Sequence, residues 1–181
     1  MTVIRCLKDG HSKFFSRLGF WLAPLALLGL RLVPAQVFMS SGLTKWNGWF
    51  DFNEQKIDLF LYEFFCPEEP RAGALLLCDP QTLDYPPGSA MVTFVEILTL
   101  SAGILEILLP VLLILGLFSR FSALGLLGMT LFIQFAVYPS WEHWWNPAVW
   151  WFVTLFAVLS MGPGKYSLDY WLKLENYKLT Q

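Results

Sequence analysis

Two long apolar stretches of this chain each carry one charged residue near their middle, Arg31 in the first and Glu106 in the second. A helix needs about 20 mostly apolar residues to cross about 30 Å of hydrocarbon, and both stretches are long enough. A charged side chain at that depth costs several kcal/mol, so such residues usually pair with one another or serve a function. The two stretches therefore predict membrane-spanning helices with a polar site between them.

The composition favours a membrane protein over a soluble one. Of the 181 residues, 56% are hydrophobic and 14% are charged, whereas ordinary soluble domains have roughly 25% charged residues. The net charge of −2 gives no indication of nucleic-acid binding, and the sequence has no Gly-rich phosphate loop or zinc-ligand spacing. We expect an all-α fold in which residues 1–181 form a single transmembrane domain.

The hydrophobic runs predict a polytopic bundle of four transmembrane helices, at about residues 20–43, 97–118, 121–138 and 145–161. Only Ser119 and Arg120 separate the second and third spans, which predicts an antiparallel hairpin. A long loop, about residues 46–90, joins the first two spans. The N-terminal stretch imitates a secretory signal, but its apolar character resumes after Arg31, so we interpret it as an uncleaved first span.

The positions of the basic residues predict the orientation of the bundle. Loops on the cytoplasmic side of a membrane are enriched in Lys and Arg, and the long loop holds eight acids against two basic residues. We therefore expect the loop to be external and both termini to be cytoplasmic. The basic residues assigned to the cytoplasmic side are Arg5, Lys8, Lys13, Arg17, Arg120, Lys165, Lys173 and Lys178.

The predicted external loop contains an apolar block and two cysteines. Residues 57–65 are too few to span the membrane, and they either cap the mouth of the bundle, lie on the outer membrane surface or form an ordinary packed helix. A structural disulfide between Cys66 and Cys78 is favoured, because the Cys-X-X-Cys spacing of thiol-exchange proteins is missing. Thiol exchange and a soft metal ion such as Cu(I) are the alternatives, and no metal site is assigned.

Three polar residues are predicted at one depth in the membrane. Counting 1.5 Å per residue from the expected cytoplasmic end of each span places Arg31, Glu106 and Gln134 at about 17–20 Å. We expect an Arg31–Glu106 ion pair with Gln134 hydrogen-bonding nearby, because pairing lowers the cost of burying charge. Such a cluster either fixes the registry of the helices or forms a ligand or proton site, and both interpretations fit the residues.

Several motifs resemble the DoxX family. They are residues 37–45 (VFMSSGLTK) after Arg31, 105–110 (LEILLP), 115–120 (LGLFSR), 134–139 (QFAVYP) with Trp141 and His143, and 162–164 (GPG) with 167–169 (SLD). The resemblance implies a four-helix protein of a bacterial-type inner (plasma) membrane, in a family named for its similarity to a subunit of a thiosulfate:quinone oxidoreductase. It also adds Lys45, Tyr138 and His143 to Arg31, Glu106 and Gln134 as candidate ligand-binding residues. The loop between Cys66 and Gly88 departs from the usual pattern.

Two functions are compatible with these observations. The first is a redox-associated membrane subunit, quinone or thiol linked, that binds a quinone-like or other small amphipathic molecule at the polar site. The sequence has no haem ligand pair, flavin motif or iron–sulfur spacing, so electrons would come from a protein partner. A homo-oligomer is the other expected assembly in the lipid bilayer. The alternative is a non-catalytic membrane partner for the maturation, export or protection of another protein or a copper-binding peptide.

The two functions predict different structures. A cavity lined by Arg31 and Glu106 would favour ligand binding, whereas a solid core with an external groove at Trp141 and Phe60 would favour the non-catalytic partner. No residue is assigned as catalytic, and an enzyme and a non-enzyme both remain compatible with the sequence.

Overall fold

The computed structural model describes the backbone of residues 2–48 and 50–174, and the side chains from residue 11 onward within them. The side chains of Arg5 and Lys8, and the whole of Lys178, lie outside the described part of the chain. The fold is built from helices, with one short two-stranded sheet. The described residues are therefore mostly helical with little strand, which agrees with the prediction in its main feature.

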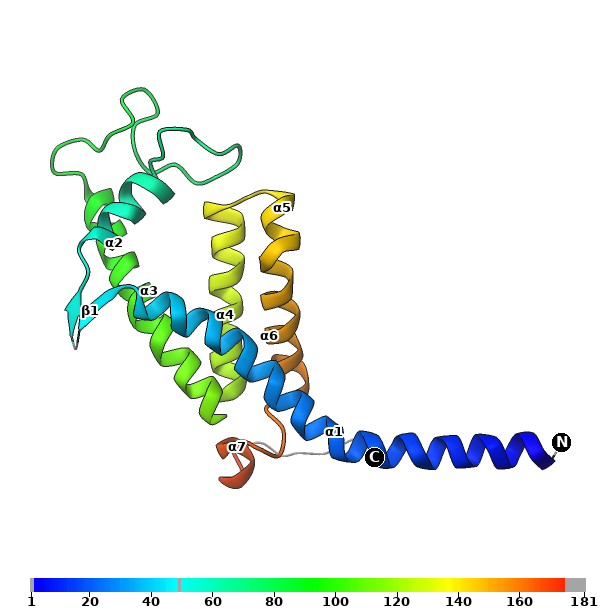
Figure 1. The fold of residues 1–181 in the computed structure, drawn as a ribbon. Helices are drawn as coiled ribbons and strands as arrows, with labels where there is room; N and C mark the ends of the chain where they lie inside the picture. Colours follow the sequence, from blue (N-terminus) through cyan, green and yellow to red (C-terminus); the bar gives the residue numbers. More distant parts are fainter. Residues whose placement is uncertain (1, 49, 175–181) are drawn as a thin grey trace.

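Four helical segments form the body of the protein (Figure 1). They are α1 (Thr2–Leu43), α3 (Ala90–Leu115), α4 (Ser119–Phe132) continued by the π-helical turn η2 (Ile133–Val137), and α6 (Val149–Met161) preceded by α5 (Trp141–His143) and the π-helical turn η3 (Trp144–Ala148). The α3–α4 connection is short, and these two helices pack against each other, as expected for the predicted hairpin. This connection consists of residues 116–118, whereas the predicted connection, Ser119 and Arg120, begins α4.

Three of these segments are long and apolar enough to cross a membrane, judged by length and composition within the described residues. They are His11–Leu43 of α1, all of α3, and Ser119–Val137 of α4 with η2. The fourth segment is interrupted, because Asn146 has non-helical backbone angles (φ −149°, ψ 102°) and α6 alone has 13 residues. The protein is therefore a largely helical chain with three candidate membrane spans.

The helices pack in a ring. Helix α1 contacts α3 and α6, and α4 contacts α3 and α6, so each helix has two principal neighbours. Between them lies a core of buried side chains that includes Phe38, Leu113, Leu126 and Leu155. The burial of such side chains stabilises the bundle mainly by close packing, because lipid tails are as apolar as the side chains themselves.

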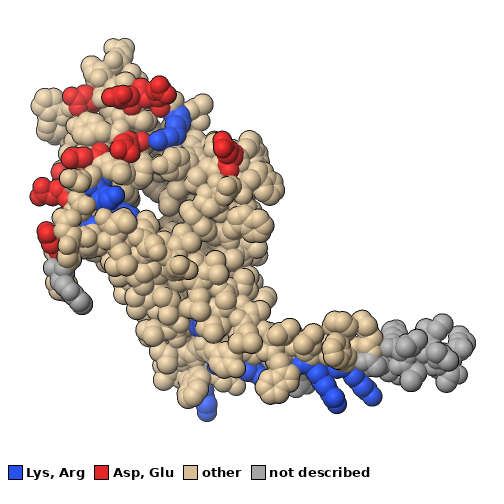
Figure 2. Space-filling view, in the orientation of Figure 1, with Lys and Arg blue, Asp and Glu red and all other residues tan. Residues whose placement is uncertain are grey.

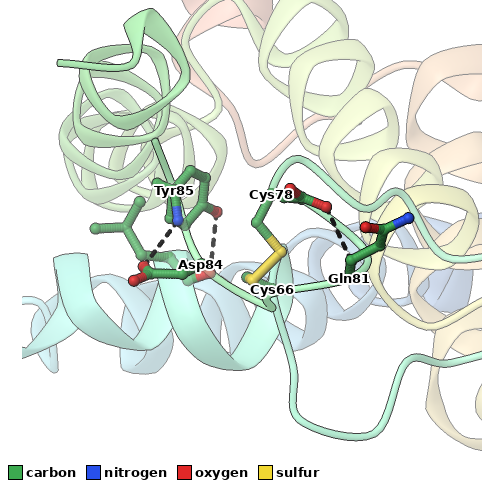
Figure 3. The surroundings of a disulfide bond; sticks show 7 residues. Cys66, Cys78, Gln81, Asp84 and Tyr85 are labelled. Carbon is green, nitrogen blue, oxygen red and sulfur yellow. Dashed lines mark hydrogen bonds between the residues drawn. A yellow bond between two sulfur atoms is a disulfide. The ribbon is translucent and has the colours of Figure 1, made fainter. Parts of the chain in front are cut away.

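Residues 44–89 fold over one end of the ring. They contain β1 (Trp46–Gly48), β2 (Asp51–Phe52), α2 (Gln55–Asp58) and the π-helical η1 (Leu59–Phe64). Strands β1 and β2 are antiparallel, with Trp46 opposite Phe52. The loop that follows η1 is closed by a disulfide between Cys66 and Cys78, whose Cα atoms are 5.6 Å apart (Figure 3). The predicted pairing of these cysteines is confirmed.

Burial stabilises the segment around the disulfide. Cys66, Cys78, Leu61 and Phe65 are buried together with residues of α3 and η2. The hydroxyl of Tyr85 donates a hydrogen bond to the carbonyl of Leu61 at 3.1 Å. Burial, with a smaller contribution from Tyr62, raises the pKa of the Tyr85 phenol above its ordinary value of 10.0, so the hydroxyl keeps the proton that it donates.

The opposite end of the ring is closed by the residues that follow α6. Helix α7 (Leu168–Trp171) is capped at its N-terminus by Ser167, whose side chain accepts a hydrogen bond from the amide of Tyr170. The buried Asp169 carboxylate accepts hydrogen bonds from the amides of Phe118 and Ser119, both at 2.8 Å. These amides begin α4, where the helix dipole favours a negative charge. Asp169 therefore holds the chain after α6 against the start of α4.

Charged side chains gather at both ends of the molecule (Figure 2). We call the end that carries residues 44–89 the acidic end, because most of the Asp and Glu side chains lie there. We call the opposite end, which carries Lys13, Arg17, Arg120, Lys165 and Lys173, the basic end. On the face shown in Figure 2, the surface between the two ends is almost entirely uncharged, as a hydrocarbon environment requires.

Candidate functional site

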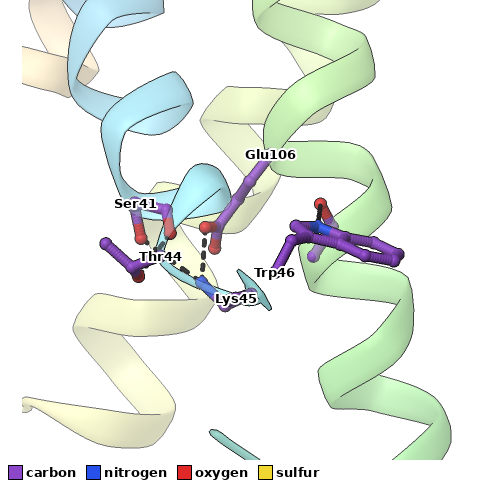
Figure 4. A network of polar contacts seen from close by, with 6 residues as sticks. Ser41, Thr44, Lys45, Trp46 and Glu106 are labelled. Atoms are coloured by element: carbon purple, nitrogen blue, oxygen red, sulfur yellow. Dashed lines mark hydrogen bonds and ion pairs between the residues drawn. The ribbon is translucent and has the colours of Figure 1, made fainter. Parts of the chain in front are cut away.

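An ion pair between Lys45 and Glu106 is the centre of the candidate site (Figure 4). The Nζ of Lys45 lies 2.5 Å from Oε2 of Glu106, and both side chains are only 6% exposed. Lys45 also donates to the hydroxyl of Ser41 at 3.3 Å, and its ammonium lies 5.8 Å from the centre of the Phe60 ring. The pair thus joins the end of α1 to the middle of α3.

The end of α1 explains why a lysine occupies this position. Helix α1 ends at Leu43, so its last carbonyls point toward Lys45, and a positive charge is favourable at this end of the helix dipole. Gly42 allows the two helices to touch, since a Cβ atom there would lie 2.8 Å from the Glu106 carbonyl oxygen. Trp46 adds a hydrogen bond from its indole Nε1 to the carbonyl of Gly103 at 3.3 Å.

The ion pair faces a cavity of about 520 Å³. Its walls come from the end of α1, from α2 and η1, and from α3, α4 and η2. The polar side chains in the lining are Ser41, Thr44, Lys45, Lys56, Ser101, Glu106 and Tyr138, and the apolar side chains include Leu59, Phe60, Phe64, Leu98, Leu105, Met129, Phe132, Ile133 and Val137. A mainly apolar cavity with a few convergent polar groups is the usual form of a small-molecule site.

A glycine keeps one wall of the cavity open. Gly128 on α4 lines the cavity, and a Cβ atom built on it would meet nothing within 4 Å. Gly125, one turn earlier, also lines the cavity, but a Cβ atom there would lie 2.7 Å from Cδ1 of Leu109. Gly125 therefore serves helix packing, whereas Gly128 leaves space that a larger side chain would fill.

The apolar block of the connecting segment forms the roof of the cavity. Phe60 and Phe64 of η1 both line it, and the centroids of their rings lie 4.9 Å apart. The disulfide follows directly after this segment, and the amide of Leu77 donates to the carbonyl of Phe65 at 2.9 Å. Residues 57–65 thus form a largely helical segment that packs against α3 and lines the cavity.

The predicted ion pair between Arg31 and Glu106 is wrong. Arg31 is fully buried near the basic end, where its Nη2 donates a hydrogen bond to the carbonyl of Tyr166. Its guanidinium lies against Gly116, which is ten residues, about 15 Å, along α3 from Glu106. The error arose because counting from a common cytoplasmic level assumes parallel spans, whereas α1 crosses α3 obliquely and ends beside Glu106 (Figure 1).

The predicted contact of Gln134 with the Arg31–Glu106 pair is also wrong. The Gln134 amide nitrogen donates to the carbonyl of Ser140 at 3.1 Å, which leaves its Oε1 toward Nδ1 of His143 at 2.7 Å. Nδ1 therefore carries the proton and donates it. Burial lowers the pKa of His143 below its ordinary value of 6.5, which favours a neutral ring. Gln134 lines a separate groove of about 420 Å³ with Trp141 and Trp144.

Tyr138 connects these two regions. It lines the cavity, its ring stacks on the His143 ring with centroids 5.0 Å apart, and the Arg71 guanidinium lies 4.7 Å from its ring centre. Of the six candidate ligand-binding residues, the structure therefore brings Lys45, Glu106 and Tyr138 to the cavity. Gln134 and His143 lie beside it, and Arg31 lies at the other end of the bundle.

Sequence reasoning missed part of the lining and the partner of Glu106. Lys45 was a candidate through the family resemblance alone, because it follows the predicted end of the first span and was not assigned a depth. Lys56, Phe60 and Gly128 had no assigned role at the site. The usable signal was a lysine just after a helix end and a glycine, Gly42, that permits close approach to a neighbouring helix.

The comparison with protein families agrees with this architecture. The family model for DoxX matches residues 26–139, which is more than half of the chain and includes every residue that lines the cavity. Searches of curated proteins and of solved structures found no match. The length of the family match, together with the helical bundle and its three candidate membrane spans, shows that the chain belongs to the DoxX family.

Proposed function

We propose that this protein is a redox-associated membrane subunit that binds a quinone-like or other small amphipathic molecule in the cavity beside Lys45 and Glu106. The observation that carries the proposal is the buried ion pair on the wall of an otherwise apolar cavity of about 520 Å³. An apolar ring or tail would fill the space between Phe60, Met129 and Phe132, and a polar head group would reach the ion pair.

The ion pair supplies both partners that a quinone-type head group needs. The Lys45 ammonium donates hydrogen bonds, so it can bind a carbonyl oxygen, and the Glu106 carboxylate accepts them, so it can bind a hydroxyl group. Glu106 is also a group that can take up or release a proton at the bound molecule. Electrons for such chemistry would come from a protein partner, because the sequence has no haem ligand pair, flavin motif or iron–sulfur spacing of its own.

We propose a four-span arrangement in a bacterial-type inner membrane, with both termini cytoplasmic and residues 46–90 external. The separation of the acidic and basic ends supports this orientation, because basic residues favour the cytoplasmic side. The disulfide supports it as well, since disulfides persist in oxidising compartments. In this arrangement residues 145–161, which lie in η3 and α6, make the fourth crossing.

The geometry favours ligand binding over a purely structural partner role. A non-catalytic partner was expected to have a solid core and one external groove containing both Trp141 and Phe60. Instead, Phe60 lines the cavity and Trp141 lines the separate groove beside Gln134. The two aromatic residues therefore do not form one docking surface.

Filling the cavity tests the proposal. Gly128→Leu places a side chain in the cavity, and Gly29→Leu is the matched control, because a Cβ atom at Gly29 also meets nothing within 4 Å and Gly29 does not line the cavity. Binding of decylubiquinone to the purified protein is measured by its effect on melting temperature and by photo-crosslinking with an azido-quinone. We expect Gly128→Leu to abolish both signals and Gly29→Leu to retain them.

The polar contacts are tested separately. Glu106→Gln should weaken binding at least about tenfold, which corresponds to the loss of one charge-assisted hydrogen bond, while the protein stays folded. Crosslinks that map outside residues 41–138, or equal binding by Gly128→Leu and the wild type, would contradict the proposed site. Equal losses of folded protein and of binding in Glu106→Gln would instead assign the ion pair to helix registry.

A further inference from the structure

Helix α1 is longer than a membrane crossing requires. Its apolar stretch from His11 to Leu43 has 33 residues, which at 1.5 Å per residue is about 50 Å, against about 30 Å of hydrocarbon. About 20 residues are sufficient to cross, so about 13 residues lie beyond the crossing. Counted from His11, these extra residues extend to Pro24, where the missing amide weakens the helix.

The first part of α1 projects away from the bundle. In Figure 1 it leaves the basic end sideways, at a steep angle to α4 and α6. All side chains from residue 11 to residue 23 are exposed, so the bundle does not cover any face of this helix. We call residues 11–23 the arm. Among its described contacts with the rest of the chain, the Lys165 ammonium lies 4.3 Å from the centre of the Phe20 ring.

The arm has a mainly apolar face and a mainly polar face. Phe14, Leu18 and Trp21 follow the spacing i, i+4, i+7, and they are 61%, 39% and 73% exposed. Phe15 and Leu22 extend the same face, and their side chains are 52% and 50% exposed.

The polar face carries the positive charges of the arm. Lys13 and Arg17 lie one turn apart, and Ser12 and Ser16 continue the face at the same spacing. Phe20 follows Lys13 at i+7, so this face also carries one aromatic ring, which is 60% exposed and lies against the Lys165 ammonium. In Figure 2 the blue side chains of the arm lie along the edge that faces away from the bundle. The arm therefore turns its charges away from the bundle.

We infer that the arm is an interfacial helix that binds the surface of the membrane leaflet at the basic end, with preference for anionic phospholipids. A basic amphipathic helix with aromatic residues on its apolar face lies in the plane of the interface, about 5–10 Å into the head-group region. Lys13 and Arg17 then face the lipid phosphates, and Arg120 and Lys165 at the same end extend the positive surface. The inference rests on the arm alone and is independent of the cavity.

Spin labels on the full chain test this inference. A nitroxide is attached to Leu18→Cys, on the apolar face, or to Ser16→Cys, on the polar face, each in a Cys6→Ser background. The proteins are placed in nanodiscs of phosphatidylcholine with or without one quarter phosphatidylglycerol. Ile104→Cys on α3, which is 47% exposed within a candidate span, is the reference for lipid exposure. Collisions with oxygen report lipid, and collisions with a neutral nickel chelate report water.

The expected result is a difference between the two faces of the arm. The nitroxide at position 18 should collide with oxygen nearly as often as the nitroxide at position 104. The nitroxide at position 16 should collide mainly with the nickel chelate. Nickel collisions at both positions would show an arm in water or on another protein, and oxygen collisions at both would show an arm inside the hydrocarbon. Either result overturns the inference.

A charge variant tests the preference for anionic lipid. Lys13→Gln with Arg17→Gln should lower the ratio of membrane-bound to mobile nitroxide at position 18 by up to about thirtyfold in discs with phosphatidylglycerol. This value follows from an attraction of about 1 kcal/mol for each of the two charges removed. The same variant should have little effect in discs of phosphatidylcholine alone. An equal effect in both lipids, or no effect in either, overturns the assignment of an anionic surface.

Discussion

Removal of the positive partner from the Lys45–Glu106 pair should destabilise the fold strongly. In Lys45→Met, Glu106 is left as a buried carboxylate without its counter-ion, since both side chains are only 6% exposed. Breaking a buried ion pair from one side costs about 3–5 kcal/mol. The adjacent cavity of about 520 Å³ has room for water near the carboxylate, so we expect the lower value, about 3 kcal/mol.

The expected change is large enough to measure. For a chain of this size, 1 kcal/mol corresponds to about 2–4 °C in melting temperature, so Lys45→Met should lower it by about 6–12 °C in detergent. Glu106→Gln should cost less, because Lys45 keeps its contacts with Ser41 and the Phe60 ring. The double variant should be more stable than the sum of the two single changes predicts, by about 2 kcal/mol, since it buries no unpaired charge.

Lys56→Met is the matched control. Lys56 lines the same cavity and makes no ion pair with any residue that the structure describes. Its replacement should change the melting temperature by no more than about 2 °C. The reasoning is refuted if Lys45→Met behaves like Lys56→Met, or if the two single changes at Lys45 and Glu106 are additive.

Three further predictions concern other contacts. Replacing Cys66 and Cys78 by Ser should lower the free energy of unfolding by about 3 kcal/mol, because the bridge closes a loop across a sequence separation of 12. Calorimetry measures this loss of stability, and a protein mass showing two free thiols in the wild type would contradict the disulfide. Asp169→Asn should cost about 2–3 kcal/mol in the same assay, because an amide replaces one of the two acceptors at the start of α4; an unchanged melting temperature would contradict the capping role. Stability should fall as the pH decreases below 6.5, because burial lowers the pKa of His143, so that the unfolded chain binds the proton first; His143→Gln should flatten this dependence, and an equal slope in both proteins would contradict it.

The helices and the disulfide could be predicted from local patterns. Long apolar runs indicate helices because the backbone must satisfy its own hydrogen bonds in lipid, and the break near Ser119 indicated the hairpin. Two cysteines in one acidic loop were sufficient to propose their pairing. Each of these predictions depends on residues that are close in sequence, which is why the structure agrees with them.

The polar contacts could not be predicted in the same way. Whether Glu106 meets Arg31 or Lys45 depends on the crossing angle of α1 and α3, and hydropathy contains no information on that angle. Gly42 and Gly116 decide the outcome in the structure, since the first admits the end of α1 to the level of Glu106 and the second gives room to Arg31. Their importance appears only once the neighbouring helix is in place.

The closure of the basic end has a consequence for how the protein is made. The contacts of Tyr166 with Arg31 and of Asp169 with the start of α4 use residues that follow α6 in the chain. A ribosome synthesises these residues only after α1, α3, α4 and α6, so the Arg31 guanidinium and the amides of Phe118 and Ser119 lack these partners until then. Completion of this end is therefore a late event in biogenesis.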